Sequence, residues 1–171
     1  GTGAVEIKSG YGLTLEDELK MLHVIRRIKE TTPLTIKSTF LGAHAVGRAY
    51  KDRQADYVDH ICKDMLPAVA AENLADFVDV FTDKGFFTVE ETDRILTEAA
   101  KYGIDKKDLI FDPLAMTISA DNNAAKETLR AVKMIKEQLG CHTSLGVSNV
   151  SFGLPERDVV NSAFFTLALG N

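Results

Sequence analysis

Short apolar runs alternate five times with longer stretches in which apolar residues recur every three or four positions. The runs, which we predict to be strands, are Ala4–Lys8, Leu34–Leu41, Phe77–Phe81, Leu109–Leu114 and Thr143–Val147. Short, nearly continuous apolar runs are typical of parallel strands that are buried on both faces. The pattern therefore predicts the order βαβαβαβαβα and a parallel sheet joined by right-handed crossovers.

Helical spacing fills the stretches between these runs. The predicted helices cover about residues 15–28, 54–71, 88–103 and 125–139, and a fifth follows residue 155. Thr88 and Glu91 predict a capping box at the start of the third helix, and Gly140 ends the fourth. Pro67 should kink or split the second helix, while Pro155 suits the first position of the fifth.

The repeat length fits the βα unit of a TIM barrel, but a closed barrel needs eight units in about 250 residues. The chain has 171 residues and five units. We therefore expect one α/β domain over residues 1–171, built as a TIM-barrel-derived fragment. Two arrangements stay open at this point: a half-barrel-like sheet, or a rearranged open doubly wound sheet.

Charge and composition argue against several classes of function. The net charge of -5 and the scattering of Lys and Arg among acids argue against a nucleic-acid or membrane-surface partner. No apolar run approaches the length of a membrane span. The chain has two cysteines, Cys62 and Cys141, without CxxC spacing. We interpret both as buried thiols of a cytoplasmic protein.

Candidate chemistry lies just after the strands, where parallel α/β folds bind their ligands. In "EIKSGYG" two glycines flank Tyr11, and in "FLGAHA" a glycine precedes His44. Both side chains suit the binding of a polar substrate group. Equally, Tyr11 suits packing on its loop, and His44 suits a purely structural role.

Asp112 and Asn149 end the fourth and fifth predicted strands. A carboxylate beside a carboxamide offers the acceptors and donors that bind a heterocycle with amide-like edges. The alternative is local: Asp112 accepts loop N–H groups and Asn149 caps a turn. The sequence holds no HxH, HExxH or paired CxxC motif, so no metal site is predicted.

Three long motifs in residues 4–104 resemble imidazolonepropionase, a hydrolase of histidine degradation in the amidohydrolase superfamily. They are "EIKSGYGLTLEDELKMLHVIRRIKE", "IKSTFLGAHAV" and "MLPAVAAENLADFVDVFTDKGFF". The resemblance implies that Tyr11 and His44 contact the substrate. It also implies a zinc or iron ion held by an HxH pair, a further histidine and an aspartate. The place expected for that further histidine, after "AAKYGI", is taken by "DLIFDPL".

Residues 105–171 resemble a different family. The motifs "KDLIFDPLAMTIS", "ETLRAVKMIKEQLG" and "TSLGVSNVSFGLPERDVVNSAFFTLAL" are similar to the methyltetrahydrofolate-binding domain of cobalamin-dependent methionine synthase, another TIM barrel. The resemblance implies that Asp112 and Asn149 hydrogen-bond a pterin ring. The family's other pterin contacts come from earlier strands, which the hydrolase-like part replaces here.

We interpret the chain as a chimera that is joined at the loop of Ile104 and Asp105 and lacks a complete active site. Recombination by engineering is the first interpretation of this join, and a natural fusion is the alternative. No catalytic activity and no cofactor are expected. The alternatives are a segment of a metal-dependent hydrolase of a cyclic amide, and residual binding of a pterin such as methyltetrahydrofolate. Open sheet edges and uncovered apolar surface predict self-association, with a homodimer as the first expectation.

Overall fold

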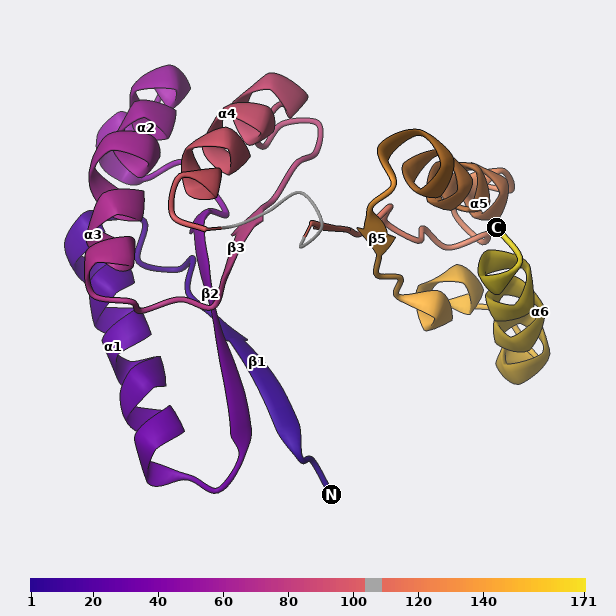
Figure 1. Ribbon diagram of the computed structural model, residues 1–171. Helices are drawn as coiled ribbons and strands as arrows, with labels where there is room; N and C mark the ends of the chain where they lie inside the picture. The colour runs from indigo at the N-terminus through magenta and orange to yellow at the C-terminus, as the bar shows by residue number, and fades with distance from the viewer. Residues whose placement is uncertain (104–108) are drawn as a thin grey trace. The chain divides into compact units, whose positions relative to one another are not determined.

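The computed structural model of the chain describes residues 1–103 and 109–171. The chain divides into two compact units, Gly1–Ile104 and Asp105–Asn171 (Figure 1), and each is described by itself. The predicted seam at Ile104 and Asp105 lies outside the described residues. Assignment of the two parts of the chain to two sources at this exact residue stays a prediction.

The first unit holds a parallel three-stranded sheet. Its strands are β1 (Ala4–Lys8), β2 (Thr35–Ala43) and β3 (Phe77–Val80), in the spatial order β1-β2-β3. All pairs are parallel, and Val5 lies beside Ile36 in the register. The order follows the chain without reversal, as neighbouring strands do in a barrel, whereas a doubly wound sheet reverses its order. The half-barrel-like alternative is the one that this sheet supports.

Helices of the first unit share one core with the sheet. They are α1 (Leu15–Thr31), η1 (Arg48–Tyr50), α2 (Gln54–His60), η2 (Ile61–Met65), α3 (Leu66–Ala71) and α4 (Val89–Ala100). Leu22 of α1, Phe40 of β2 and Ile95 of α4 are among its fully buried side chains. Figure 1 shows α1, α2 and α3 along one side of the strands. Burial of these apolar faces is the main stabilising contribution to the unit.

The helix boundaries follow the predicted signals with one refinement. The Thr88 hydroxyl accepts the Glu91 N–H at 3.2 Å, and the Glu91 carboxylate accepts the Thr88 N–H at 2.9 Å, so the capping box is confirmed. The second helix is interrupted as expected, but by a π-helical turn, η2, that precedes Pro67. Pro67 then lies in the first turn of α3, where its missing N–H needs no partner.

The sheet face opposite the helices is mainly polar, although it also carries Phe77. Lys8 Nζ lies 2.6 Å from Asp79 Oδ2, and Thr39 Oγ1 donates to Glu6 Oε1 at 2.5 Å. These residues come from all three strands and alternate with the apolar side chains that face the helices. The face that barrel closure would enclose is therefore compatible with water in this chain.

The second unit holds a parallel two-stranded sheet and a small core. Its elements are β4 (Ile110–Phe111), α5 (Ala124–Met134), η4 (Ile135–Leu139), β5 (His142–Thr143), η5 (Val147–Ser151) and α6 (Arg157–Leu169). The core consists of Ala115, Val150 and Phe164, with partly buried apolar side chains around them. Helix α5 continues into the π-helical η4, and Gly140 ends it in the left-handed conformation, as predicted.

Three sequence predictions for this unit were wrong in detail. The strand predicted at Leu109–Leu114 is only Ile110–Phe111, since Pro113 carries no N–H for a ladder and Leu114 has φ +55°. The strand predicted at Thr143–Val147 stops at Thr143, and Val147–Ser151 instead forms a 3-10 turn. Helix α6 begins at Arg157 rather than Pro155, because Glu156 has φ +51° and cannot lie within a helix.

The fold class is confirmed as α/β with parallel strands joined by helices. Within the described residues the strands form two separate sheets rather than one five-stranded sheet, and neither sheet closes into a barrel. Both sheets keep the βα order of a barrel fragment.

Candidate functional site

The loop after β1 is held by a buried carboxylate. Glu18, which has no solvent exposure, accepts the N–H groups of Gly10 at 2.9 Å, Gly12 at 2.8 Å and Leu13 at 2.9 Å. Gly10 has φ +104°, and a Cβ there would lie 2.7 Å from the Leu41 carbonyl oxygen. Both features fix the loop that carries Tyr11.

Sequence reasoning missed Glu18. Its position is readable in hindsight, because Glu18 precedes the buried Leu22 and Ile25 by four and seven residues and so lies on the buried stripe of α1. A charged residue on that stripe indicates a nearby set of donors, since an isolated buried carboxylate is strongly disfavoured.

Tyr11 and His44 come together at the carboxyl ends of β1 and β2. Their ring centroids are 5.0 Å apart in an edge-to-face arrangement. His44 Nδ1 lies 2.9 Å from the Gly10 carbonyl oxygen. A carbonyl only accepts, so Nδ1 carries the proton and, in the neutral ring, Nε2 is the acceptor. The Tyr11 side chain is exposed, 76% of the residue's surface being accessible.

Two further rings continue this arrangement, and the sequence analysis did not single them out. The His44 centroid lies 6.2 Å from that of Phe81, and Phe81 lies 4.3 Å from Phe86. Both phenylalanines are partly exposed. Their signal was the "VFTDKGFF" segment, which begins at the last residue of β3. The rim of the first unit therefore presents aromatic faces beside one imidazole acceptor and one phenol.

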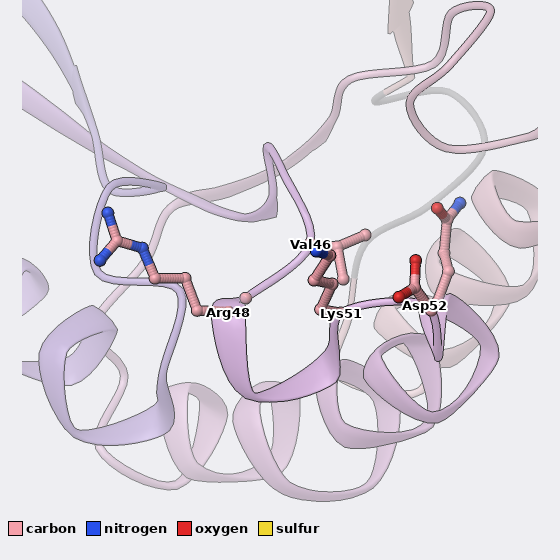
Figure 2. A pocket seen from close by; sticks show the side chains of 6 residues that line it. Val46, Arg48, Lys51 and Asp52 are labelled. Atoms are coloured by element: carbon pink, nitrogen blue, oxygen red, sulfur yellow. The ribbon is translucent and has the colours of Figure 1, made fainter.

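An open pocket of about 690 Å³ begins two residues beyond His44 (Figure 2). It is lined by Val46, Gly47, Arg48, Lys51, Asp52 and Gln54. Figure 2 shows the Arg48 side chain pointing away from Lys51 and Asp52, so the charged groups do not converge on one point. Gln54 links the pocket to the aromatic rim, because its Nε2 donates to the Phe86 carbonyl oxygen at 2.9 Å.

Asp112 has a local role in the structure. Its Oδ1 accepts the N–H of Leu114 at 2.9 Å, which is the Asx turn that an aspartate before proline favours. The second carboxylate oxygen makes no hydrogen bond with the described residues. A ligand that donates a hydrogen bond therefore still has one acceptor on Asp112.

Asn149 lies inside the 3-10 turn η5 rather than at a strand end. Its N–H donates to the Gly146 carbonyl oxygen at 3.1 Å. The side chain lies against Gly146, where a Cβ would be 2.9 Å from Asn149 Nδ2. Among the described residues, no hydrogen bond joins Asn149 to Asp112. The structure thus brings Tyr11 and His44 together but gives no direct contact between Asp112 and Asn149, and the binding roles of all four stay predictions.

The metal implied by the hydrolase resemblance finds no matching set of ligands. In the described part of the chain, no three His, Cys, Asp or Glu side chains gather as metal ligands. The described residues therefore do not fit the ion.

A cluster of charged side chains lies at the opposite, amino edge of the first sheet. Asp76 accepts the Ser38 N–H at 2.9 Å, Lys37 Nζ at 2.9 Å and Lys29 Nζ at 3.1 Å. Partial burial alone would raise the pKa of Asp76, but these bonds outweigh it and hold the pKa well below its usual value. This cluster ties β2, β3 and α1 together and is remote from the rim.

Comparison with known proteins identifies the later part of the chain. The model of the family described as pterin binding enzyme matches residues 68–171, more than half of the chain. The chain belongs to the pterin binding enzyme family. Both candidate pterin contacts, Asp112 and Asn149, fall inside the region that matches this pterin binding enzyme model.

Other relatives are imidazolonepropionases. The chain is 54% identical over 107 residues to the imidazolonepropionase of Flavobacterium psychrophilum and 55% identical over 107 residues to that of Flavobacterium johnsoniae. The identity to the Alkaliphilus oremlandii protein is 48% over 107 residues. These matches cover 63% of this chain and 25–26% of each relative, so the chain spans about a quarter of their length.

The chain is therefore a chimera of two parent types, one imidazolonepropionase-like and the other a pterin binding enzyme. Any run of 107 residues in a chain of 171 includes residues 65–107, so the two similarities overlap at least over residues 68–107. Strand β3 and helix α4 both lie in the region that the two similarities share. Every helix in the described ranges is too short or too polar to cross a lipid bilayer.

Proposed function

We propose that the chain is an engineered recombination of βα units without a complete active site and without native catalytic activity. The proposal rests on the order of the two similarities along the chain. Units similar to imidazolonepropionase come first, and the match to the pterin binding enzyme model runs on to residue 171. In βα barrels the catalytic groups come from the ends of several strands. Replacing units therefore replaces part of the catalytic set of each parent.

The rim of the first unit supports binding rather than turnover. Tyr11, His44 and the two phenylalanines offer ring faces, one acceptor nitrogen and one hydroxyl. These groups orient a ring-shaped ligand, but they supply neither a nucleophile with its base nor an activated water. The buried thiols Cys62 and Cys141 support the proposal that the chain works in a reducing compartment such as the cytoplasm.

An assay for hydrolysis of imidazolonepropionate tests the main proposal. The full chain, supplied with zinc or iron, is compared with buffer and with the intact Flavobacterium psychrophilum imidazolonepropionase. We expect no turnover above buffer. Turnover that depends on added metal and disappears in His44→Ala would refute the proposal and would favour the hydrolase segment, the function that the 54% identity supports.

A second candidate function is residual binding of a pterin such as methyltetrahydrofolate. The family match and the acceptor left on Asp112 favour it. Calorimetry with methyltetrahydrofolate should then give heat that Asp112→Ala removes. Asp121→Ala is the matched control, because Asp121 Oδ1 accepts the Asn123 N–H at 2.8 Å in a similar turn of the same unit. Absence of heat with the unaltered chain ends this candidate.

A further inference from the structure

The loop between β3 and α4 carries two rings of the aromatic rim. Phe81 begins this loop and Phe86 lies near its end, and their ring centroids are 4.3 Å apart in a tilted arrangement. The two residues are exposed by 37% and 41%. A loop ring that is open to water on one side keeps its place only when the backbone that carries it is held. The contacts of this backbone therefore decide the shape of the rim.

The loop closes on itself. The Phe86 N–H donates to the Asp83 carbonyl oxygen at 3.0 Å, and the Phe87 N–H donates to the Phe81 carbonyl oxygen at 3.3 Å. Gly85 has φ +88°, which a glycine adopts without strain. These bonds define the shape of the loop, but none of them fixes its place against the rest of the unit.

One face of α2 anchors the end of the loop. The Phe87 side chain is buried, and its ring centroid lies 6.4 Å from that of Tyr57. Three residues before Tyr57, the Gln54 Nε2 donates to the Phe86 carbonyl oxygen at 2.9 Å. Residues three apart share a helix face, so α2 holds the ring of Phe87 and the carbonyl of Phe86 together. The peptide unit between these two phenylalanines cannot then turn without breaking the bond to Gln54.

Gln54 also contacts the start of helix α4. Its Nε2 donates to Glu91 Oε2 at 2.7 Å, and the same carboxylate oxygen accepts the Thr88 N–H of the capping box at 2.9 Å. A primary amide carries no charge and offers two N–H groups in one plane, and both are used here. Gln54 therefore joins three parts of the first unit, namely α2, the end of the rim loop and the cap of α4.

We propose that Gln54 is a positioning residue of the aromatic rim. Its bond to the Phe86 carbonyl oxygen holds the Phe86 ring against that of Phe81, and the two rings form the apolar side of the site beside His44. The inference rests on the ring binding proposed for this rim. The ligand that fits is planar and aromatic with one N–H group, because the rings offer faces and the neutral His44 offers Nε2 as an acceptor. Gln54 acts on this ligand through the loop.

The ring contact is measured first, without a ligand. Nuclear Overhauser effects between the Phe81 and Phe86 rings report their approach, and circular dichroism verifies folding. Gln54→Ala removes both donors, and we expect these effects to be lost. Gln54→Asn, whose amide lies on a side chain one methylene group shorter, should lose them as well. Gln138→Ala is the matched control and should keep them, because Gln138 is an exposed glutamine of η4 that makes no side-chain hydrogen bond with the described residues.

Indole is the probe for binding, since it is planar and has one N–H group. Titration followed by the His44 ring resonances should give a dissociation constant of roughly millimolar order for so open a site. Loss of one aromatic contact should weaken indole binding by about threefold to tenfold in Gln54→Ala. Gln138→Ala should stay within about twofold of the unaltered chain. Indene, which has the same shape without the N–H group, should bind more weakly than indole.

Loss of the ring contacts together with weaker indole binding in Gln54→Ala supports the proposal. A Gln54→Ala chain that unfolds at lower urea concentration but keeps its ring contacts and its indole affinity would overturn it, because a purely structural bond changes stability alone. Ring contacts that survive in Gln54→Ala would overturn it as well. Absence of indole binding by the unaltered chain would refute ring binding at the rim, and the ring contacts would then still decide whether Gln54 holds Phe86.

Discussion

Replacing Glu18 by Gln should loosen the loop that carries Tyr11. The carboxylate accepts three backbone N–H groups, two on Oε1 from Gly12 and Leu13 and one on Oε2 from Gly10. A glutamine oxygen can still accept the first two. Its NH₂ group cannot accept the third, because a donor would then face a donor.

The magnitude follows from these contacts. A hydrogen bond to a charged acceptor contributes about 1.5–3 kcal/mol, and leaving a buried donor without a partner costs about 1–3 kcal/mol. These two effects describe the same lost bond and overlap, so we expect Glu18→Gln to lower the free energy of unfolding by about 2–4 kcal/mol. Glu16→Gln is the matched control on the exposed side of α1, with an expected change within about 0.5 kcal/mol.

Urea unfolding followed by far-ultraviolet circular dichroism measures both variants, since the chain has no tryptophan. Amide hydrogen exchange then locates the effect: the N–H of Gly10 should lose protection, and those of Gly12 and Leu13 should lose less. Equal unfolding free energies for Glu18→Gln and Glu16→Gln would refute the reasoning. So would a loss of stability without faster exchange in the loop.

Three further outcomes follow from other contacts. The folded-state pKa of Asp76 is depressed, so the contribution of this carboxylate to the free energy of unfolding is full above its unfolded pKa of about 3.9 and is lost as the pH falls below that value. Replacing Asp76 by Asn should therefore make the free energy of unfolding less dependent on pH in acid. An unchanged pH dependence contradicts this. Burial raises the pKa of Tyr57, whose hydroxyl donates to the Gly42 carbonyl oxygen at 2.9 Å. Ultraviolet titration should therefore show one tyrosine that ionises only when the chain unfolds, and this late step should be missing in Tyr57→Phe. Gly10→Ala should destabilise the chain by about 1–3 kcal/mol in urea unfolding, because the new Cβ meets a carbonyl oxygen at 2.7 Å and φ is positive; a neutral result would show that the loop relaxes.

The sequence predicted the first unit better than the second, for a physical reason. β1 is found at the predicted residues, and β2 and β3 differ from prediction by a residue or two at their ends. Each of these strands has apolar residues on the side that faces the helices, and each is followed by helical segments that can cover that side. Pattern, caps and packing agree there, which is the condition under which local signals fix structure.

Local turn chemistry overrode the apolar pattern in the second unit. Pro113 and the positive φ of Leu114 end β4 after two residues, and a turn replaces the predicted strand at Val147. A run of apolar residues cannot show such turns, because it reports burial and not backbone conformation. For the site, spacing placed Tyr11 and His44 at one edge, but it could not reveal Glu18, whose partners are backbone groups rather than side chains.

The two units differ in the polarity of the surfaces that the other units of a barrel would cover. In the first, the open sheet face carries Glu6, Lys8 and Asp79, which remain solvated and paired without strands to enclose them. In the second, the flanks of α6 present Leu167 and Phe165, for which water is a poor environment. The second unit, the smaller of the two, therefore exposes ten of the 18 large apolar residues that are exposed in the described chain, and the first unit exposes the other eight.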